Sequence, residues 1–200
     1  MKQLRIHILW GILFINNIIA AQGGRTIESI NGGWKFFPQG QAYAETVAFN
    51  DDAWQSISLP HSWNAFDPFD DDRTYVRGIG WYRKQLKLDP SWKNKQVFLY
   101  FEAANQVAGV YVNGSFAGIH KGGYTGFAID VTRYLNWNVA NASNIIAIQV
   151  SNAHDPFIPP LNVGYASYGG IYRDAWVIAT GKLHFTDINT NSSGVYVTTP

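Results

Sequence analysis

The stretch Tyr168-Gly169-Gly170-Ile171-Tyr172-Arg173-Asp174-Ala175-Trp176 decides the fold, because a glycine pair runs straight into a strand of alternating large and polar residues. Glycine pairs mark backbone that needs positive φ or a close approach by a neighbour. Arg173 and Asp174 lie inside the predicted strand Tyr172–Ala179, so their side chains leave opposite faces. We therefore predict that each pairs with a distant partner and ties the domain to itself or to a neighbouring domain.

Short β-prone runs alternate with turns along the chain after residue 24. The clearest hairpin joins Val107–Val112 to Ser115–Gly118, because Asn113-Gly114 supplies the two positive-φ residues of a type I′ turn. No segment holds a helical apolar period over three turns, and one short helical turn is predicted at Val131–Leu135. Further strands are predicted at Trp34–Phe37, Gln96–Phe101 and Asn144–Val150. This pattern predicts an all-β, antiparallel jelly-roll sandwich.

Three further motifs precede the glycine pair in a fixed order. They are Leu59–Asn64, Gly80–Lys84, and Phe101–Ala104 leading to Val110–Gly114. With Tyr168–Trp176 they resemble the N-terminal jelly-roll domain of glycoside hydrolase family 2, the β-galactosidase and β-glucuronidase group. The resemblance covers roughly residues 28 to 200. It implies that an immunoglobulin-like sandwich follows, and then a (β/α)8 barrel that holds the catalytic glutamates.

Composition predicts a well-packed domain with an uncharged ligand. The chain is 46% hydrophobic, 16% aromatic and only 14% charged, so it can bury a large core. The high aromatic content has two interpretations. The first is that the aromatic side chains fill the core of a sandwich, and the second is that they form surfaces that stack on sugars. The formal net charge is +1, without a Lys/Arg run. Nucleic acid and anionic membrane surfaces are excluded as partners, because both need a concentrated positive field. A neutral polar ligand such as a glycan is compatible with a net charge close to zero.

Residues 1–23 are typical of a secretory signal peptide. Lys2 and Arg5 form a basic start, Ile8–Ile15 is an apolar run, and Ala20-Ala21 offers a cleavage site. The run is short for a transmembrane helix, and no membrane contact is expected after the signal is removed. The chain has no cysteine. Export without disulfides fits a bacterial protein of the periplasm, the cell surface or the extracellular space.

The pattern of strands restarts after Thr180-Gly181. Leu183–Ile188 and Gly194–Thr199 are predicted to be the first strands of a second unit. We therefore divide the chain into a jelly-roll domain at 24–181 and the start of an immunoglobulin-like β domain at 182–200. Two strands do not make a stable sheet alone, so the chain is predicted to be the front of a longer polypeptide.

No catalytic constellation is found in the sequence. Retaining glycosidases need two carboxylates roughly 5 Å apart, and the densest acids, Asp67 and Asp70–Asp72, surround Pro68 in a predicted solvated loop. A calcium site in that loop is the alternative interpretation. No nucleophile elbow or Walker loop occurs, and the five histidines lack ligand spacing. We therefore predict no catalytic residue, no metal site and no cofactor in this chain.

The resemblance implies two sets of substrate contacts. In the family, a loop of this domain extends toward the substrate, and by position this loop is Asp67–Arg77. Its candidate hydrogen-bond donors are Arg73, Tyr75 and Arg77. These three side chains are predicted to bind sugar hydroxyls.

The second set precedes the glycine pair. Relatives carry an Asp-aromatic pair five residues before the first glycine, where this sequence has Gly164-Tyr165. Asn162 or Asp155 could substitute for the missing Asp, although a neutral Asn binds a hydroxyl without charge assistance. Tyr165 and Tyr168 have two interpretations, stacking on a sugar ring or packing. The absent Asp leaves the choice open among galactosides, glucuronides and mannosides.

The corner Leu59–Asn64 has a structural and a functional interpretation. Pro60 and the aromatic residues predict a rigid corner packed by Trp63. In the functional interpretation, His61 and Trp63 bring the following loop toward the mouth of the barrel. Both residues are assigned here a structural or interdomain role.

These observations lead to one interpretation with two alternatives. The chain is interpreted as the non-catalytic N-terminal part of an exported, β-galactosidase-like family 2 glycosidase. The parent enzyme would hydrolyse O-glycosyl bonds of terminal β-linked sugars with retention, and this part would shape the substrate pocket together with the barrel. The alternatives are a stand-alone glycan-binding module and an architectural domain that contacts no ligand.

Overall fold

The computed structural model describes residues 24–67, 69, 75–138, 143–159, 168–184 and 198–199. Within these ranges the chain forms ten strands and two short 3-10 helices. In chain order they are β1 (Thr26–Ser29), β2 (Trp34–Phe37), β3 (Gln55–Ile57), β4 (Ile79–Lys87), η1 (Pro90–Asn94), β5 (Gln96–Phe101), β6 (Val107–Val112), β7 (Ser115–Lys121), β8 (Phe127–Asp130), η2 (Thr132–Tyr134), β9 (Ser143–Ser151) and β10 (Ala175–Thr180).

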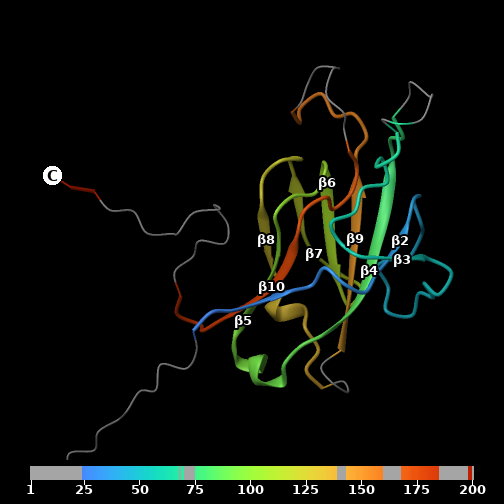
Figure 1. Cartoon of the computed structure of the whole chain (residues 1–200). Coiled ribbons are helices and arrows are strands. Elements are labelled where there is room, and N and C mark those ends of the chain that lie inside the picture. Colours follow the sequence, from blue (N-terminus) through green and yellow to red (C-terminus); the bar gives the residue numbers. More distant parts are fainter. Residues whose placement is uncertain are drawn as a thin grey trace, which may run out of the picture.

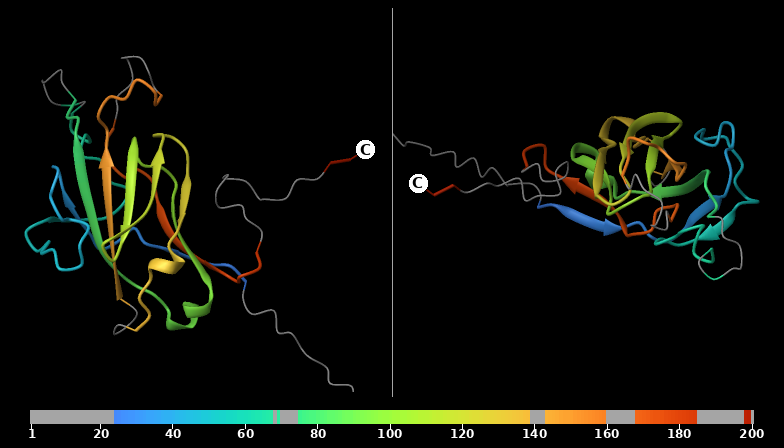
Figure 2. Two further views of the ribbon diagram at one scale, coloured as in Figure 1. Left: turned by 180° about the vertical axis from the view of Figure 1, so that it is seen from behind. Right: turned by 90° about the horizontal axis from the view of Figure 1, so that it is seen from above.

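The strands form two antiparallel sheets that pack face to face (Figures 1 and 2). One sheet has the order β1-β10-β5-β8 and the other β3-β2-β4-β9-β6-β7. Every strand pair in both sheets is antiparallel. The predicted all-β antiparallel fold is therefore confirmed.

The core lies between the sheets because each strand turns alternate side chains inward. Leu99 and Val177 contribute from the four-stranded sheet, and Tyr82, Ile148 and Val110 from the six-stranded sheet. All five are almost fully buried. Most of the aromatic excess belongs to this core and to two smaller clusters.

The predicted Asn-Gly hairpin is confirmed. β6 and β7 pair directly, and Asn113 and Gly114 have φ values of 50° and 83°. The Asn113 side chain secures the turn, because its Oδ1 accepts a bond from Ile145 N at 2.9 Å and its Nδ2 donates to Tyr134 O at 2.9 Å. The strands predicted at 34–37, 96–101 and 144–150 correspond to β2, β5 and β9.

The strand predicted at Tyr172–Ala179 is wrong at its start, because β10 begins at Ala175. Asn31 holds the preceding backbone instead: its Nδ2 donates to Asp174 Oδ1 at 3.0 Å, and its Oδ1 accepts from Ala175 N at 2.8 Å. Arg173 is exposed and lies over the Tyr172 ring, with its guanidinium carbon 5.8 Å from the ring centroid. Arg173 and Asp174 therefore do not lie within a strand, but Asp174 does have the predicted distant partner, Asn31.

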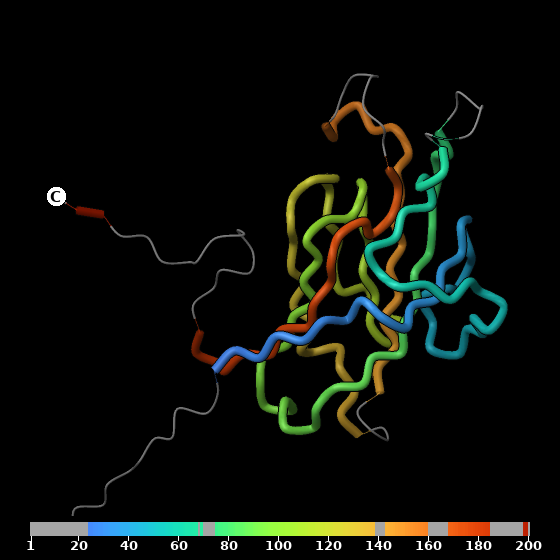
Figure 3. The backbone as a smooth tube through the Cα atoms, viewed as in Figure 1, coloured from blue at the N-terminus to red at the C-terminus, as the bar shows by residue number. Residues whose placement is uncertain are grey.

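The strand directions gather the motif loops at one end of the sandwich, as the tube in Figure 3 shows. At this end β4, β6, β8 and β10 begin, and β5 and β9 end. We call it the loop end. It comprises residues 59–67, 75–78, 102–106, 122–126, 152–159 and 168–174.

Two predicted segments lie outside the described residues. They are the signal segment 1–23 and most of the second unit at 182–200, of which only 182–184 and 198–199 are described. In the described part of the chain, no helix is long and apolar enough to span a membrane.

Candidate functional site

The glycine pair packs against the Leu59–Asn64 corner at the loop end. A Cβ on Gly169 would overlap the Trp63 indole, and a Cβ on Gly170 would lie 2.5 Å from His61 O. Gly170 also has a φ of 124°, which side chains rarely adopt. The predicted need for close approach and positive φ is therefore confirmed.

Trp63 is the point where three motifs meet. Its ring stacks on Phe36 with centroids 5.8 Å apart and planes 13° apart. A Cβ on Gly80 would lie 2.8 Å from Trp63 Cζ3. Trp63 N also donates to Gly169 O at 3.3 Å. The indole thus joins the corner, β4 and the glycine pair in one packed unit.

His61 lies against the core on the other side of this corner. Its Nδ1 is 2.9 Å from Tyr82 Oη, and its ring centroid is 4.5 Å from that of Phe36. Burial lowers the pKa of His61 below its ordinary value of 6.5 and raises the pKa of Tyr82. The pair is therefore neutral at pH 7, and this chemistry favours a packing role for His61.

Asn64 is a site residue that the sequence interpretation missed. It is fully buried, and its Nδ2 donates to Asp67 Oδ2 at 2.6 Å and to Val76 O at 2.8 Å. Its Oδ1 accepts from Asn152 Nδ2 at 3.1 Å and from Gly169 N at 2.6 Å. No local pattern marks Asn64 as buried, because one of its partners is 105 residues away.

Two of the predicted sugar-contact residues come together at the loop end. The rings of Tyr75 and Tyr168 meet edge to face, with centroids 6.5 Å apart and planes 89° apart. Tyr168 is 40% exposed and Tyr75 is half-buried. Arg77 is exposed two residues after Tyr75. We call Tyr75 and Tyr168 the tyrosine edge.

The other predicted contacts, Arg73, Asn162 and Tyr165, lie outside the described residues. So do Asp70–Asp72 of the alternative calcium site. Asp155, the second candidate for the missing carboxylate, accepts a bond from Phe157 N at 2.8 Å. Among the described residues, no group of three His, Cys, Asp or Glu side chains gathers in one place.

The loop end also exposes apolar side chains that the sequence interpretation did not select. Phe66, Phe69 and Phe157 are 81%, 86% and 90% exposed, and Val76, next to Tyr75 in the chain, is exposed as well. Soluble monomers seldom expose large apolar patches unless these bind something. The aromatic residues on the loops beside the tyrosine edge therefore indicate a contact surface.

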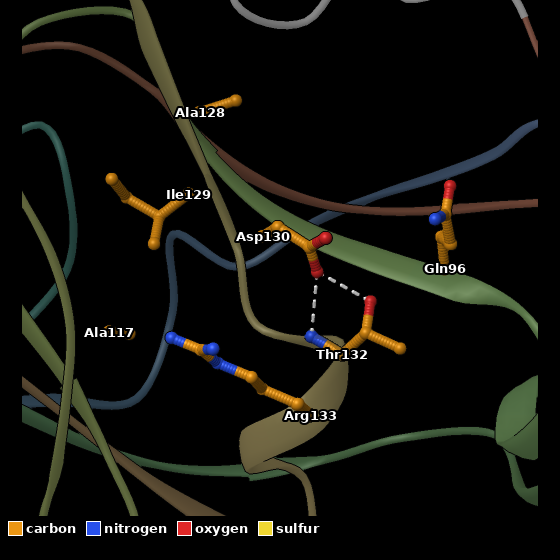
Figure 4. A pocket seen from close by; sticks show the side chains of 7 residues that line it. All are labelled: Gln96, Ala117, Ala128, Ile129, Asp130, Thr132 and Arg133. Carbon is orange, nitrogen blue, oxygen red and sulfur yellow. Dashed lines mark hydrogen bonds between the residues drawn. The ribbon is translucent and has the colours of Figure 1, made fainter.

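A hollow of about 540 Å³ lies at the opposite end of the sandwich, between β7, β8 and η2 (Figure 4). Asp130 Oδ1 beside it accepts bonds from Thr132 N at 2.9 Å and Thr132 Oγ1 at 2.6 Å. The lining residues are Gln96, Ala117, Ala128, Ile129, Asp130, Thr132 and Arg133. No predicted contact residue and no aromatic ring lines this hollow, so the loop end is the better candidate site.

The two antiparallel sheets and their connecting loops have the architecture of a jelly-roll domain. Residues 27–180 match the family model described as "Glycosyl hydrolases family 2, sugar binding domain". The chain belongs to this family, as its four motifs predicted.

Proteins from three bacteria illustrate the relationship. The chain is 37% identical to a β-galactosidase of Thermoanaerobacter pseudethanolicus over 82% of its own length and 22% of that protein. It is 34% identical to a β-glucuronidase of Formosa agariphila, over 86% of its length and 19% of that protein. The crystal structure of a Bacteroides uniformis β-glucuronidase superposes with a TM-score of 0.79 at 39% identity, over 85% of this chain and 20% of that one. The chain thus spans about a fifth of these relatives.

Proposed function

We propose that the chain is the non-catalytic N-terminal part of an exported β-glycosidase, and that its loop end forms one wall of a pocket for a terminal β-linked sugar. The meeting of Tyr75 and Tyr168 at the loop end carries this proposal. Sugar pockets need apolar ring surfaces and a few placed polar groups. Two half-exposed tyrosines, with phenol hydroxyls at their tips, offer both.

The catalytic carboxylates of the proposed enzyme belong to another part of the polypeptide. Retaining hydrolysis uses one carboxylic acid as the acid/base and one carboxylate as the nucleophile. The matching part of this chain covers only about a fifth of the relatives named as a β-galactosidase and a β-glucuronidase. Two described acids at the loop end, Asp67 and Asp155, instead accept backbone hydrogen bonds from Val76 N and Phe157 N.

Export is proposed from the basic start and apolar run within residues 1–23. N-terminal sequencing of the mature protein tests it. A start near residue 24 supports export, and an intact Met1 in the mature protein contradicts it.

Replacing Tyr75 or Tyr168 with alanine in the full-length enzyme is expected to raise KM for aryl β-glycosides up to about tenfold, with little change in kcat. An aromatic contact contributes about 0.5–1.5 kcal/mol, and losing uniform binding raises KM alone. Steady-state kinetics measures both constants. Tyr43→Ala is the matched control, because Tyr43 is 74% exposed and lies in the loop beside the Gly114 turn. Unchanged constants in both tyrosine variants would support an architectural domain instead.

A further inference from the structure

We infer that Asn64, Asp67 and Asn152 form a positioning cluster that locks the two tyrosine-bearing loops to each other. We call these three residues the Asn–Asp cluster. The coupling of the loops is inferred from hydrogen-bond geometry alone. Its consequence for substrate binding rests on the proposed function.

Asn64 makes every hydrogen bond that an asparagine side chain can make. An amide has two N–H donors and two acceptor lone pairs, and Asn64 bonds Asp67, Val76, Asn152 and Gly169 at 2.6–3.1 Å. It is fully buried, where an unmade bond is costly. The side chain therefore has one favourable orientation, and all four partners must be in place to keep it.

One side of the cluster holds the loop that carries Tyr75. Val76 O accepts from Asn64 Nδ2 at 2.8 Å and from Asn152 Nδ2 at 3.0 Å. Val76 N donates to Asp67 Oδ2 at 2.8 Å, a charge-assisted bond. Gly78 N donates to Asn152 Oδ1 at 2.8 Å. The residues immediately after Tyr75 are thus held by side chains.

The other side of the cluster holds the loop that carries Tyr168. Gly169 N, which follows Tyr168 directly, donates to Asn64 Oδ1 at 2.6 Å. A single side chain therefore bonds the residue after Tyr75 and the residue after Tyr168. The edge-to-face spacing of the two rings depends on this link, because each ring is one residue away from it.

The amide nitrogens of Val76, Gly78 and Gly169 each report on one member of the cluster. Val76 N binds Asp67, Gly78 N binds Asn152, and Gly169 N binds Asn64. Their hydrogen exchange can be followed residue by residue, since local opening sets the exchange of such amides. If Asp67 only caps Val76 N, its loss changes exchange at Val76 alone. If the cluster is coupled, exchange at Gly169 changes as well.

The test is Asp67→Ala in the full-length protein, followed by hydrogen–deuterium exchange mass spectrometry at single-residue resolution. Losing the carboxylate frees the Asn64 amide to reorient, so exchange at both Val76 and Gly169 is expected to rise at least about tenfold. Asp67→Asn keeps an acceptor oxygen and is expected to restore most of the protection at both positions. Faster exchange at Val76 alone would overturn the inference, because Asp67 would then be a local cap.

Asp130→Ala is the matched control. Asp130 also accepts one backbone and one side-chain bond, from Thr132 N and Thr132 Oγ1, but at the opposite end of the sandwich. It is expected to leave exchange at Val76, Gly78 and Gly169 unchanged. Faster exchange at these amides in the control would also overturn the inference, because any loosening of the sandwich would then reach them.

Kinetics of the same Asp67→Ala enzyme tests the sugar contact of the tyrosine edge separately from the coupling of the loops. If the tyrosine edge binds sugar, KM for an aryl β-glycoside rises severalfold, kcat stays constant, and Asp67→Asn recovers KM. Coupled exchange with an unchanged KM supports the positioning cluster and contradicts the proposed sugar contact. Uncoupled exchange overturns the cluster, whatever KM shows.

Discussion

Gly170→Ala is expected to destabilise the domain by about 4 kcal/mol. A residue forced into sparsely populated backbone costs about 1–3 kcal/mol, and overpacking a core adds about 1–3 kcal/mol. Both apply, because Gly170 has φ 124° and a Cβ would lie 2.5 Å from His61 O and 2.6 Å from Tyr82 Oη. His61 O is a backbone atom, so it cannot move away by a change of side-chain rotamer.

Thermal unfolding followed by circular dichroism measures the effect, and a loss of this size lowers Tm by roughly 10 °C in a domain of 150–250 residues. Gly40→Ala is the control. Nothing lies within 4 Å of a Cβ at Gly40, so its stability should stay within about 0.5 kcal/mol of the parent. Similar Tm values for Gly170→Ala and Gly40→Ala would show that the glycine pair does not need its special backbone.

Arg83→Met is expected to cost about 3 kcal/mol, the usual cost of removing one partner from a buried ion pair. The Arg83 side chain is 2% exposed, and its Nε donates to Asp51 Oδ2 at 2.7 Å. Its guanidinium also bonds the carbonyls of Ala44, Thr46 and Phe49. The side chain therefore attaches the loop between β2 and β3 to β4, and its loss removes one donor from each of these acceptors.

Urea unfolding gives the free energy for this variant. Arg133→Met is the control, because Arg133 is exposed over the Tyr134 ring, and its loss should cost less than about 1 kcal/mol. Arg83→Lys should recover only part of the stability, since an ammonium lacks the planar fork of a guanidinium. Equal stability of Arg83→Met and the parent would contradict this role.

The structural features that could be predicted best from the sequence are those whose cause lies in neighbouring residues. Asn113-Gly114 carries its own positive-φ preference. The alternation from Ile146 to Val150 places Ile146, Ile148 and Val150 in the main core. The start of β10 could not be predicted this way. It depends on Asn31, whose side chain bonds residues 143 and 144 positions away.

The candidate site was predicted in part, and for the same physical reason. Family resemblance identified Tyr75 and Tyr168, and the structure brings their rings together. Asn64 and Asn152 were not selected, because a buried asparagine and a surface asparagine look alike until their partners are known. The exposed Phe66, Phe69 and Phe157 could not be told from core aromatics by composition, which carries no information about which face a loop residue takes.

The most direct test of the account compares turnover of aryl β-glycosides by residues 24–200 and by the full-length protein. We expect hydrolysis with retention by the full-length protein and none by residues 24–200, because the proposed catalytic carboxylates lie outside these residues. Turnover by pure residues 24–200 would contradict the non-catalytic role. Absence of turnover by the full-length protein across galactosides, glucuronides and mannosides would contradict the proposed enzyme.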